Sequence, residues 1–390
     1  MNCKIIRLIS LSFLLGFLSP EIYAQELQDG TGETDGYKLV WQDLFDGDVL
    51  NESENWSIEV NGDGGGNSEL QYYRRENISL GKEPESGSNC LIITARKEEF
   101  KGKTATSGRL TTQRKMSFKH GKIEARIKLP HTANGLWPAF WLLGNTISSE
   151  GWPKCGEIDI LEMGNATGIS NNNQDRYFNG ACHWGYYEDG WYPNYAKAST
   201  NSYGMQDDFH LFTMTWDENT IQMYLDKDKY PNVQPYYAMD ISSKSAPKDP
   251  GNYFHRQFFV IFNLAVGGNF TGIWDINKIT ALSDGEAKMY VDYVKVYQKG
   301  TDDEEFFGPK LPVSITAHDP QVEINYDVSD RKINIVGEVK RFSLFSINGR
   351  TMLDRYNSNM IDLSHFQTGL YILNIEMQNG NSVSRKFWLK

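Results

Sequence analysis

The chain of 390 residues is poor in cysteine, has no excess of basic residues and lacks long apolar runs beyond its N-terminal segment. Four cysteines are too few for a disulfide scaffold of this size. A net charge of −11, from 39 basic and 50 acidic residues, argues against a nucleic-acid binder, which needs a basic face. Aromatic residues make up 13% of the chain, which excludes disorder as its main state.

The first 24 residues are predicted to be a secretory signal peptide. Lys4 and Arg7 precede an apolar run over 8–18, and Ala24 offers a small residue at a cleavage point before Gln25. The alternative is a membrane anchor, but this run is too short to span a bilayer. No later segment has 18 uninterrupted apolar residues. We therefore expect a secreted or cell-surface protein without stable membrane insertion.

Three cysteines lie outside this segment: Cys90, Cys155 and Cys182. An odd number leaves at least one thiol unpaired within a monomer, the oligomeric state that we expect. A Cys155–Cys182 disulfide is one interpretation, since both residues lie beside the motifs described below. Three buried free thiols are the other.

Changes in composition predict the domain organisation. A polar leader over 25–36 precedes a main domain over 37–299. Residues 300–312 combine an acidic run with glycine and two prolines, which is typical of a linker. A second, smaller domain follows over 313–390.

The main domain shows strand patterns and no long helical periodicity. Residues 126–129 and 211–216 alternate between apolar and polar side chains, and 290–297 are rich in β-branched and aromatic residues. Many short strands without intervening helices predict an all-β sandwich of antiparallel sheets. Two large curved sheets would leave a concave face that suits a long polymer.

The sharpest motif is Gly-Glu-Ile-Asp-Ile-Leu-Glu at 156–162. On a strand, Glu157 and Asp159 lie on one face, and the isoleucines between them point to the other. Glu162 reaches the acidic face only if one extra residue, a β-bulge near 160–161, is inserted. The sequence therefore predicts three carboxyl groups on one face of a bulged strand.

Three crowded carboxyl groups suit glycoside hydrolysis. Like charges raise the pKa of at least one of them. One carboxylate can then attack the anomeric carbon while a protonated carboxyl group donates its proton to the leaving oxygen. The alternatives are an exposed acidic strand and a calcium site. Calcium ligands usually come from loops, however, and an exposed strand seldom alternates acids with isoleucines so strictly.

The spacing Glu157-x-Asp159-x-x-Glu162 resembles the catalytic signature of glycoside hydrolase family 16, in its bulged, laminarinase-like form. Further motifs resemble other strands of that family, at 107–112, 121–126, 135–143, 263–268 and 291–297. The resemblance implies a β-jelly-roll with a concave glycan-binding cleft and a retaining mechanism that requires no cofactor. It implies that Glu157 is the nucleophile and Glu162 the general acid/base, with Asp159 tuning both.

The resemblance also supplies candidates for substrate binding: Trp137, Trp141, His183, Arg109, Asn67, Glu69, Trp191 and Asn263. Trp137 is expected to stack on a sugar ring, whereas Trp141 fits a core position equally well. His183 lies either near the acid/base or in a structural role. Asn67, Glu69 and Arg109 resemble residues of negative subsites, with solvated loop or strand positions as the alternative. Asn263 faces the cleft or makes a strand-end hydrogen bond.

Two further features concern the rim and the opposite side of the sandwich. Residues 185–203 form a loop dense in tyrosine and tryptophan that we expect to border the cleft, with Trp191 its named candidate. Family members often bind a structural calcium ion, and Asp292 matches that position by motif.

The C-terminal residues resemble the sorting domain of the type IX secretion system of Bacteroidetes. This resemblance rests on alternating strands at 342–350 and 369–375 and on a terminal run at 385–390. It implies a small β-sandwich that is recognised by the secretion machinery. A carbohydrate-binding module is the alternative, but Trp388 is the only tryptophan there.

The first hypothesis is a secreted endo-acting enzyme that cleaves β-1,3-glucan such as laminarin, or mixed β-1,3/1,4-glucan. A second keeps the enzyme class but takes an algal galactan as the polysaccharide. A third is a glycan-binding protein on the same fold without catalysis.

Overall fold

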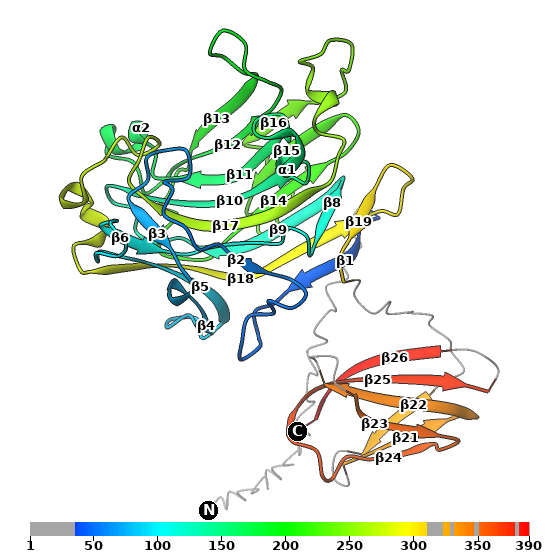
Figure 1. Ribbon diagram of the computed structural model, residues 1–390. Coiled ribbons are helices and arrows are strands. Elements are labelled where there is room, and N and C mark those ends of the chain that lie inside the picture. The colour runs from blue at the N-terminus through cyan, green and yellow to red at the C-terminus, as the bar shows by residue number, and fades with distance from the viewer. Residues whose placement is uncertain (1–35, 310–322, 328–330, 347–350, 379–381, 390) are drawn as a thin grey trace, which may run out of the picture.

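The computed structural model describes residues 36–309, 323–327, 331–346, 351–378 and 382–389 (Figure 1). The predicted signal peptide, most of the leader and the last three residues of the predicted linker, 310–312, lie outside these residues. The rest of the predicted linker is described, and its residues 305–307 form a strand of the main domain, so the predicted domain boundary at residue 299 is wrong. The described part is built almost entirely from antiparallel strands, in agreement with the predicted all-β class. Within it, no helix has the length and apolar character needed to cross a membrane.

One sheet of the main domain has ten strands, in the order β16-β15-β14-β9-β18-β5-β6-β3, with β1 paired to β18 and β4 to β5. Their bounds are β1 Lys38–Asp43, β3 Gln71–Tyr73, β4 Ile78–Lys82, β5 Asn89–Arg96, β6 Ala105–Ser107, β9 Gly121–Lys128, β14 His210–Trp216, β15 Thr220–Leu225, β16 Tyr237–Asp240 and β18 Glu286–Gln298.

The other sheet has nine strands, in the order β13-β12-β11-β10-β17-β7-β2, with β8 paired to β17 and β19. Their bounds are β2 Ser57–Ile58, β7 Arg109–Thr111, β8 Ser117–Lys119, β10 Leu136–Gly144, β11 Glu157–Met163, β12 Tyr177–His183, β13 Asn194–Thr200, β17 Phe258–Val266 and β19 Glu305–Phe307. Figure 1 shows the two curved sheets stacked on each other.

The helices are short and lie between strands. They are α1 Ile147–Glu150 and α2 Ala166–Ser170, together with the 3-10 segments η1 Arg75–Asn77, η2 Pro250–Asn252, η3 Ile276–Lys278 and η4 Thr280–Leu282.

The core lies between the two sheets. β9 alternates buried and half-buried residues along its whole length, which is the pattern of a strand with one face in a core. Ile158 and Ile160 of β11 join the same cluster of buried residues as Ile123 of β9 and Val294 of β18. The inner face of the nine-stranded sheet is therefore apolar. We call its opposite side the outer face.

The cysteines are free thiols. Cys90, Cys155 and Cys182 are all buried and unbonded. Cys182 belongs to the main core, whereas Cys155 packs in a small cluster on the outer face with Leu143 and Phe259. Because the two thiols lie on opposite faces of the sheet, the Cys155–Cys182 disulfide interpretation is wrong and the free-thiol interpretation holds.

The C-terminal residues form two smaller sheets, in the orders β20-β21-β24 and β23-β22-β25-β26. Their bounds are β20 Glu323–Asp327, β21 Lys332–Val336, β22 Val339–Ser346, β23 Thr351–Tyr356, β24 Met360–Asp362, β25 Gly369–Met377 and β26 Ser382–Leu389. They enclose a core of their own, which includes Ile333, Phe342, Leu344 and Leu373. The predicted small β-sandwich is present, and the side chain of Trp388 lies outside the described residues.

Candidate active site

The site is built on β11 and depends on an extra residue in that strand. Along β12, the partners of Asp159 and Glu162 are Ala181 and Asn179, two residues apart, although the acids themselves are three apart. The pairing of β11 with β10 shifts at the same place. The predicted bulge at positions 160–161 is therefore present. It leaves the apolar residues of the strand buried in the core and brings Glu162 to the face that carries Asp159.

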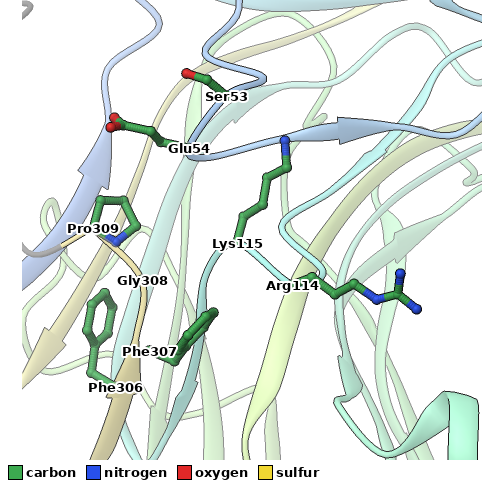
Figure 2. Close-up of a pocket in the computed structure, with 8 residues that line it drawn as sticks. All are labelled: Ser53, Glu54, Arg114, Lys115, Phe306, Phe307, Gly308 and Pro309. Atoms are coloured by element: carbon green, nitrogen blue, oxygen red, sulfur yellow. The ribbon is translucent and has the colours of Figure 1, made fainter.

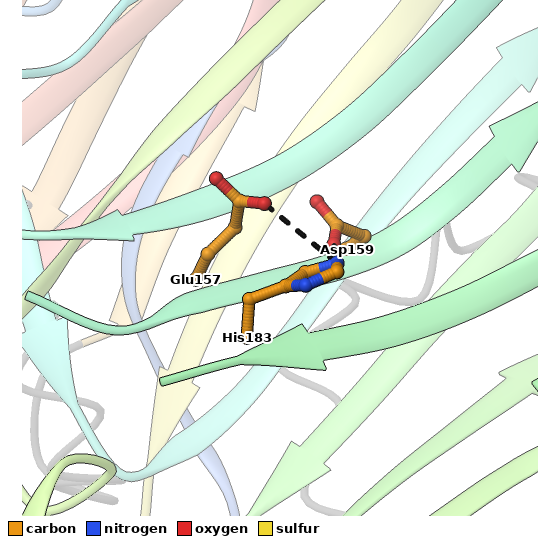
Figure 3. A group of neighbouring side chains, drawn as sticks. All are labelled: Glu157, Asp159 and His183. Carbon is orange, nitrogen blue, oxygen red and sulfur yellow. Dashed lines mark ion pairs between the residues drawn. The ribbon is translucent and has the colours of Figure 1, made fainter. Parts of the chain in front are cut away.

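His183 lies beside Glu157 and Asp159 (Figure 3). The two acidic side chains are largely buried. The Glu157 side chain is 17% exposed and that of Asp159 is 8% exposed. His183 Nε2 lies 3.5 Å from Asp159 Oδ2 and 3.9 Å from Glu157 Oε1. These three residues form the one group in the described part of the chain whose His, Cys, Asp or Glu atoms gather closely enough to hold a metal ion.

His183 is neutral in this setting. Burial lowers the pKa of His183 to about 4, and its Nδ1 lies 3.2 Å from the hydroxyl of Tyr192. A neutral ring can turn one nitrogen to that hydroxyl and the other to Asp159. The ring therefore closes one end of the acidic cluster without adding positive charge.

Glu157 experiences opposing influences. Burial raises its pKa most, and the negative charge of Glu162 raises it further. The Arg109 guanidinium and a hydrogen bond from Trp152 act in the other direction. Of these neighbours, only Arg109 carries a positive charge, and this charge favours the carboxylate form of Glu157.

Glu162 is held from two sides. Asn179 Nδ2 donates to its Oε2 at 2.7 Å, and Trp137 Nε1 donates to its Oε1 at 3.1 Å. Burial raises the pKa of Glu162 despite these two hydrogen bonds. This glutamate therefore tends to keep a proton, and both of its oxygens are fixed in place.

Asp159 lies between the two glutamates. Burial raises the pKa of Asp159 far above its usual range, and the charges of Glu157 and Glu162 add to the effect. A neutral Asp159 separates the two glutamates without adding a third negative charge. This is compatible with the tuning role that the family resemblance implies for Asp159.

Trp137 is placed to position Glu162 as well as to border the site. One face of its indole ring stacks on Phe270, with centroids 4.5 Å apart and 10° between the planes. Its indole N–H donates a hydrogen bond to Glu162. Only the face away from Phe270 is left for a sugar ring.

Trp141 and Asn263 belong to a hydrogen-bonded chain beside the acids. Trp141 pairs with Asp159 across the sheet, is half-buried and donates to Asn263 Oδ1 at 2.7 Å. Asn263 donates in turn to the Tyr73 hydroxyl at 3.3 Å, and Tyr73 donates to Glu69 Oε2 at 3.2 Å. Both ends of the Asn263 amide are thereby engaged within the protein.

Arg109 joins this chain to the acids. Its guanidinium lies 4.8 Å above the ring of Trp141 and its Nε lies 3.0 Å from Glu59. Arg109 therefore orients a cleft-side indole ring and also acts electrostatically on Glu157.

Two residues predicted at the negative subsites lie in different settings. Glu69 is only 5% exposed and also accepts from Gln71, so it supports the site from behind. Asn67 is half-buried in the turn that precedes Glu69, where its amide donates to Gly65 at 3.3 Å. Asn67 is the more accessible of the two.

The aromatic loop reaches the acids through residues that the sequence did not single out. Trp191 is 56% exposed and its ring lies under Lys248 Nζ at 5.3 Å. The ring that contacts both Tyr192 and His183 is that of Trp152, at 4.8 Å and 6.1 Å. Trp152 lies only five residues before Glu157. This short distance along the sequence could have identified Trp152 as a candidate site residue.

Asp292 faces a cation of the protein itself. Arg126 Nη1 donates to its Oδ2 at 2.6 Å. A calcium ion at this carboxylate would have to share it with the guanidinium. The expected calcium site therefore gains no support from this geometry.

A surface pocket lies away from the acids (Figure 2). Its volume is about 460 Å³, and its lining includes Lys115, Phe306 and Phe307. None of the predicted site residues lines it. The predicted catalytic residues therefore do not belong to this pocket.

Comparisons with known proteins agree with this geometry. Residues 73–254 match "Glycosyl hydrolases family 16", and residues 320–390 match "Secretion system C-terminal sorting domain". The clotting factor G alpha subunit of Tachypleus tridentatus is 35% identical over 296 residues, which cover 75% of this chain but only 39% of that protein.

Two solved structures cover the main domain. A Bacteroides ovatus mixed linkage glucan GH16, in complex with a G4G4G3G product, is 40% identical and has a TM-score of 0.57. The match spans 66% of this chain and 99% of that one. The catalytic domain of an endo-1,3-beta-glucanase (laminarinase) from Thermotoga petrophila RKU-1 is 35% identical, has a TM-score of 0.55, and is matched over 68% and 99% of the two chains. Together with the acids on the bulged strand, these matches show that the chain belongs to glycosyl hydrolases family 16.

Proposed function

We propose that the protein is a secreted, endo-acting, retaining glycoside hydrolase that cleaves β-1,3-glucan or mixed β-1,3/1,4-glucan. The observation that carries this proposal is the bulge in β11, which brings Glu157, Asp159 and Glu162 to one face. A merely acidic surface strand would not require a bulge, and it would not bury its carboxyl groups.

The first chemical step forms a covalent intermediate. The Glu157 carboxylate, favoured by Arg109, attacks the anomeric carbon of the bound glucosyl residue. Glu162 gives its proton to the glycosidic oxygen, and the bond between that oxygen and the anomeric carbon breaks. The new chain end leaves as an alcohol, and Glu157 remains as a glycosyl ester.

The second step regenerates the enzyme. Glu162, now a carboxylate, takes a proton from a water molecule, whose oxygen attacks the anomeric carbon from the side that the leaving group had occupied. The bond to Glu157 breaks and Glu157 becomes a carboxylate again. Two inversions leave the product with the β configuration. None of these steps requires a cofactor.

The choice of β-glucan is supported by the solved relatives. One is described with mixed linkage glucan and the other as an endo-1,3-beta-glucanase. In the organisation that we propose, the catalytic domain extends through β19, which pairs with β8. A linker follows it, and residues 313–390 are recognised by the secretion machinery. We expect the enzyme to act as a monomer.

The test is analysis of the products formed from laminarin, lichenan, agarose and carrageenan. Oligosaccharides from laminarin or lichenan support the proposal. Cleavage of a galactan alone would agree with the proposed mechanism but contradict the proposed β-glucan substrate. Glycan binding without turnover, unaltered in Glu157→Gln, contradicts catalysis and favours a binding protein.

A further inference from the structure

The hairpin between β12 and β13 carries a pre-shaped tip. Glu188 and Trp191 exchange both backbone hydrogen bonds, at 2.8 Å and 3.0 Å, around Asp189 and Gly190. Those two residues have φ of 52° and 78°, the positive values of a type I′ turn. Lys248 pairs with Glu188 at 2.7 Å and anchors the tip from a separate loop. The hairpin tip is therefore held in shape by contacts within the protein.

The hairpin and the segment before β11 together present an aromatic shelf, which we define as Trp152, Tyr187 and Tyr192. Tyr187 and Tyr192 lie 5.0 Å apart between ring centroids, Trp152 and Tyr192 4.8 Å, and Trp152 and Tyr187 6.0 Å. Tyr187 is 54% exposed and Trp152 is 38% exposed. Three rings thus support one another while two keep a large accessible surface.

The shelf is continuous with the catalytic acids. Trp152 donates a hydrogen bond to Glu157, and the hydroxyl of Tyr192 lies 3.2 Å from His183 Nδ1. A polymer held at Glu157 therefore meets these rings as it leaves the acidic cluster toward the hairpin. β13 forms the outer edge of the sheet, so nothing in the strand order continues the surface beyond it (Figure 1).

The chemistry of the shelf suits a pyranose ring. Exposed rings that are held in place bind the apolar C–H face of a pyranose, and burying them is favourable. Glu188 at the tip is paired with Lys248, so the rings are the main recognition element of the shelf.

We propose that the aromatic shelf is an outlying subsite that binds a glucosyl residue of the same chain, away from the bond that is cleaved. This rests on the proposed β-glucanase function and makes the enzyme favour long chains over short ones. Tyr187 is its specificity-determining residue, because its ring is exposed and does not itself contact the acids.

The test compares a long and a short substrate in the full-length protein. Tyr187→Ala is expected to raise KM for laminarin about five- to tenfold, the range of one aromatic contact, with little change in kcat. The same variant should leave kcat/KM for a laminari-oligosaccharide too short to reach the shelf unchanged. Tyr187→Phe should retain wild-type KM, because it keeps the ring. Tyr230→Ala, at an equally exposed tyrosine in the β15–β16 loop, is the matched control.

Equal effects on both substrates, or no effect on either, would overturn the shelf proposal in an enzyme that is active on β-glucan. If the wild type turns over no β-glucan, the proposed function fails, and the two failures are thereby distinguished. A melting curve of Tyr187→Ala that matches the wild type shows that any change is local.

Discussion

Glu157 and Glu162 are chemically identical but differ in their surroundings. Glu157 has a guanidinium nearby, whereas Glu162 has only neutral donors, Asn179 and Trp137. A positive charge favours an anion more strongly than neutral N–H groups do. Burial nevertheless raises both pKa values, that of Glu157 to about 8 and that of Glu162 to about 7, so this order does not separate the two roles. The assignment of the nucleophile to Glu157 and the proton donor to Glu162 rests on the family resemblance.

Ionisation of the buried Glu157 should lower the free energy of unfolding. Its pKa in the folded protein is raised above the unfolded value of about 4.3. Folding therefore favours the protonated form, and stability falls as pH rises from that unfolded value through the raised folded value. Glu157→Gln removes this cost, so we expect its Tm to exceed the wild type by about 2–4 °C at pH 8.

At pH 4 the same substitution should change Tm little, because both states of the wild type are then largely protonated. Thermal melts at the two pH values make the measurement. Glu218→Gln, at an exposed turn, is the control. A gain of equal size at both pH values would contradict the stated origin of the effect.

Trp137→Phe tests the hydrogen bond to Glu162. Losing a donor to the carboxylate raises the pKa of Glu162 further, so the acid stays protonated to higher pH. The alkaline limb of kcat/KM should move to higher pH, and the rate should fall because one oxygen of Glu162 is no longer fixed. The measurement is a pH profile on laminarin.

Trp141→Phe provides the comparison, since it also removes an indole donor, but one that serves Asn263. It should weaken substrate binding and leave the alkaline limb in place. If both variants move the limb alike, the bond from Trp137 to Glu162 does not set the acid's pKa.

At the scale of a single element, β11 places the acids through one extra residue. Deleting Ile160 should restore a regular strand in which Glu157 and Glu162 are four residues apart and therefore still lie on one face. We expect a cooperatively folded main domain that still cleaves laminarin, with a lower unfolding free energy because a buried side chain is lost. Circular dichroism and turnover of laminarin are the measurements.

Ile160→Val is the matched control because it keeps the bulge. It should cost about 1 kcal/mol of unfolding free energy and leave the enzyme active. A deletion variant that folds but does not cleave laminarin would show that the bulge does more than set the face on which Glu162 lies.

The bulge could be predicted from the sequence, because a five-residue spacing conflicts with the two-residue period of a strand and the apolar residues fix the face. The partners of the acids could not. Asn179 reaches the site through the pairing of β11 with β12, and Trp152 and Tyr192 reach it through loop contacts. Neither strand register nor loop shape can be predicted from a local sequence pattern. The hydrogen bonds of Glu69 to Gln71 and Tyr73 could not be predicted either, and its role at a negative subsite stays a prediction.

At the scale of the whole molecule, the chain has two separate apolar cores. The buried residues of the two large sheets end at Val296, with Phe306 of β19 packed against them, and the cluster of the C-terminal sheets begins at Ile333. Fold class and this division were predictable, since strand periodicity and the composition of the linker are properties of the local sequence. The distribution of the cysteines over two faces of one sheet was not, because it depends on strand register.

Two cores predict two unfolding transitions. A chain that ends at Pro309 should keep the transition of the main domain and its activity on laminarin, and should lose the other transition. Differential scanning calorimetry of both chains is the measurement. A single transition in the full chain that shifts on truncation would contradict independent cores. The full chain is the matching control for activity.

The central claim is that Glu157 and Glu162 carry out a double displacement. The most direct test follows the hydrolysis of laminarin by the full chain with proton NMR, before mutarotation mixes the anomers. The account predicts that the β-anomer of the new reducing end appears first and the α-anomer later. If the α-anomer forms first, the reaction inverts, Glu157 does not form a covalent intermediate, and the assignment of the two glutamates is wrong.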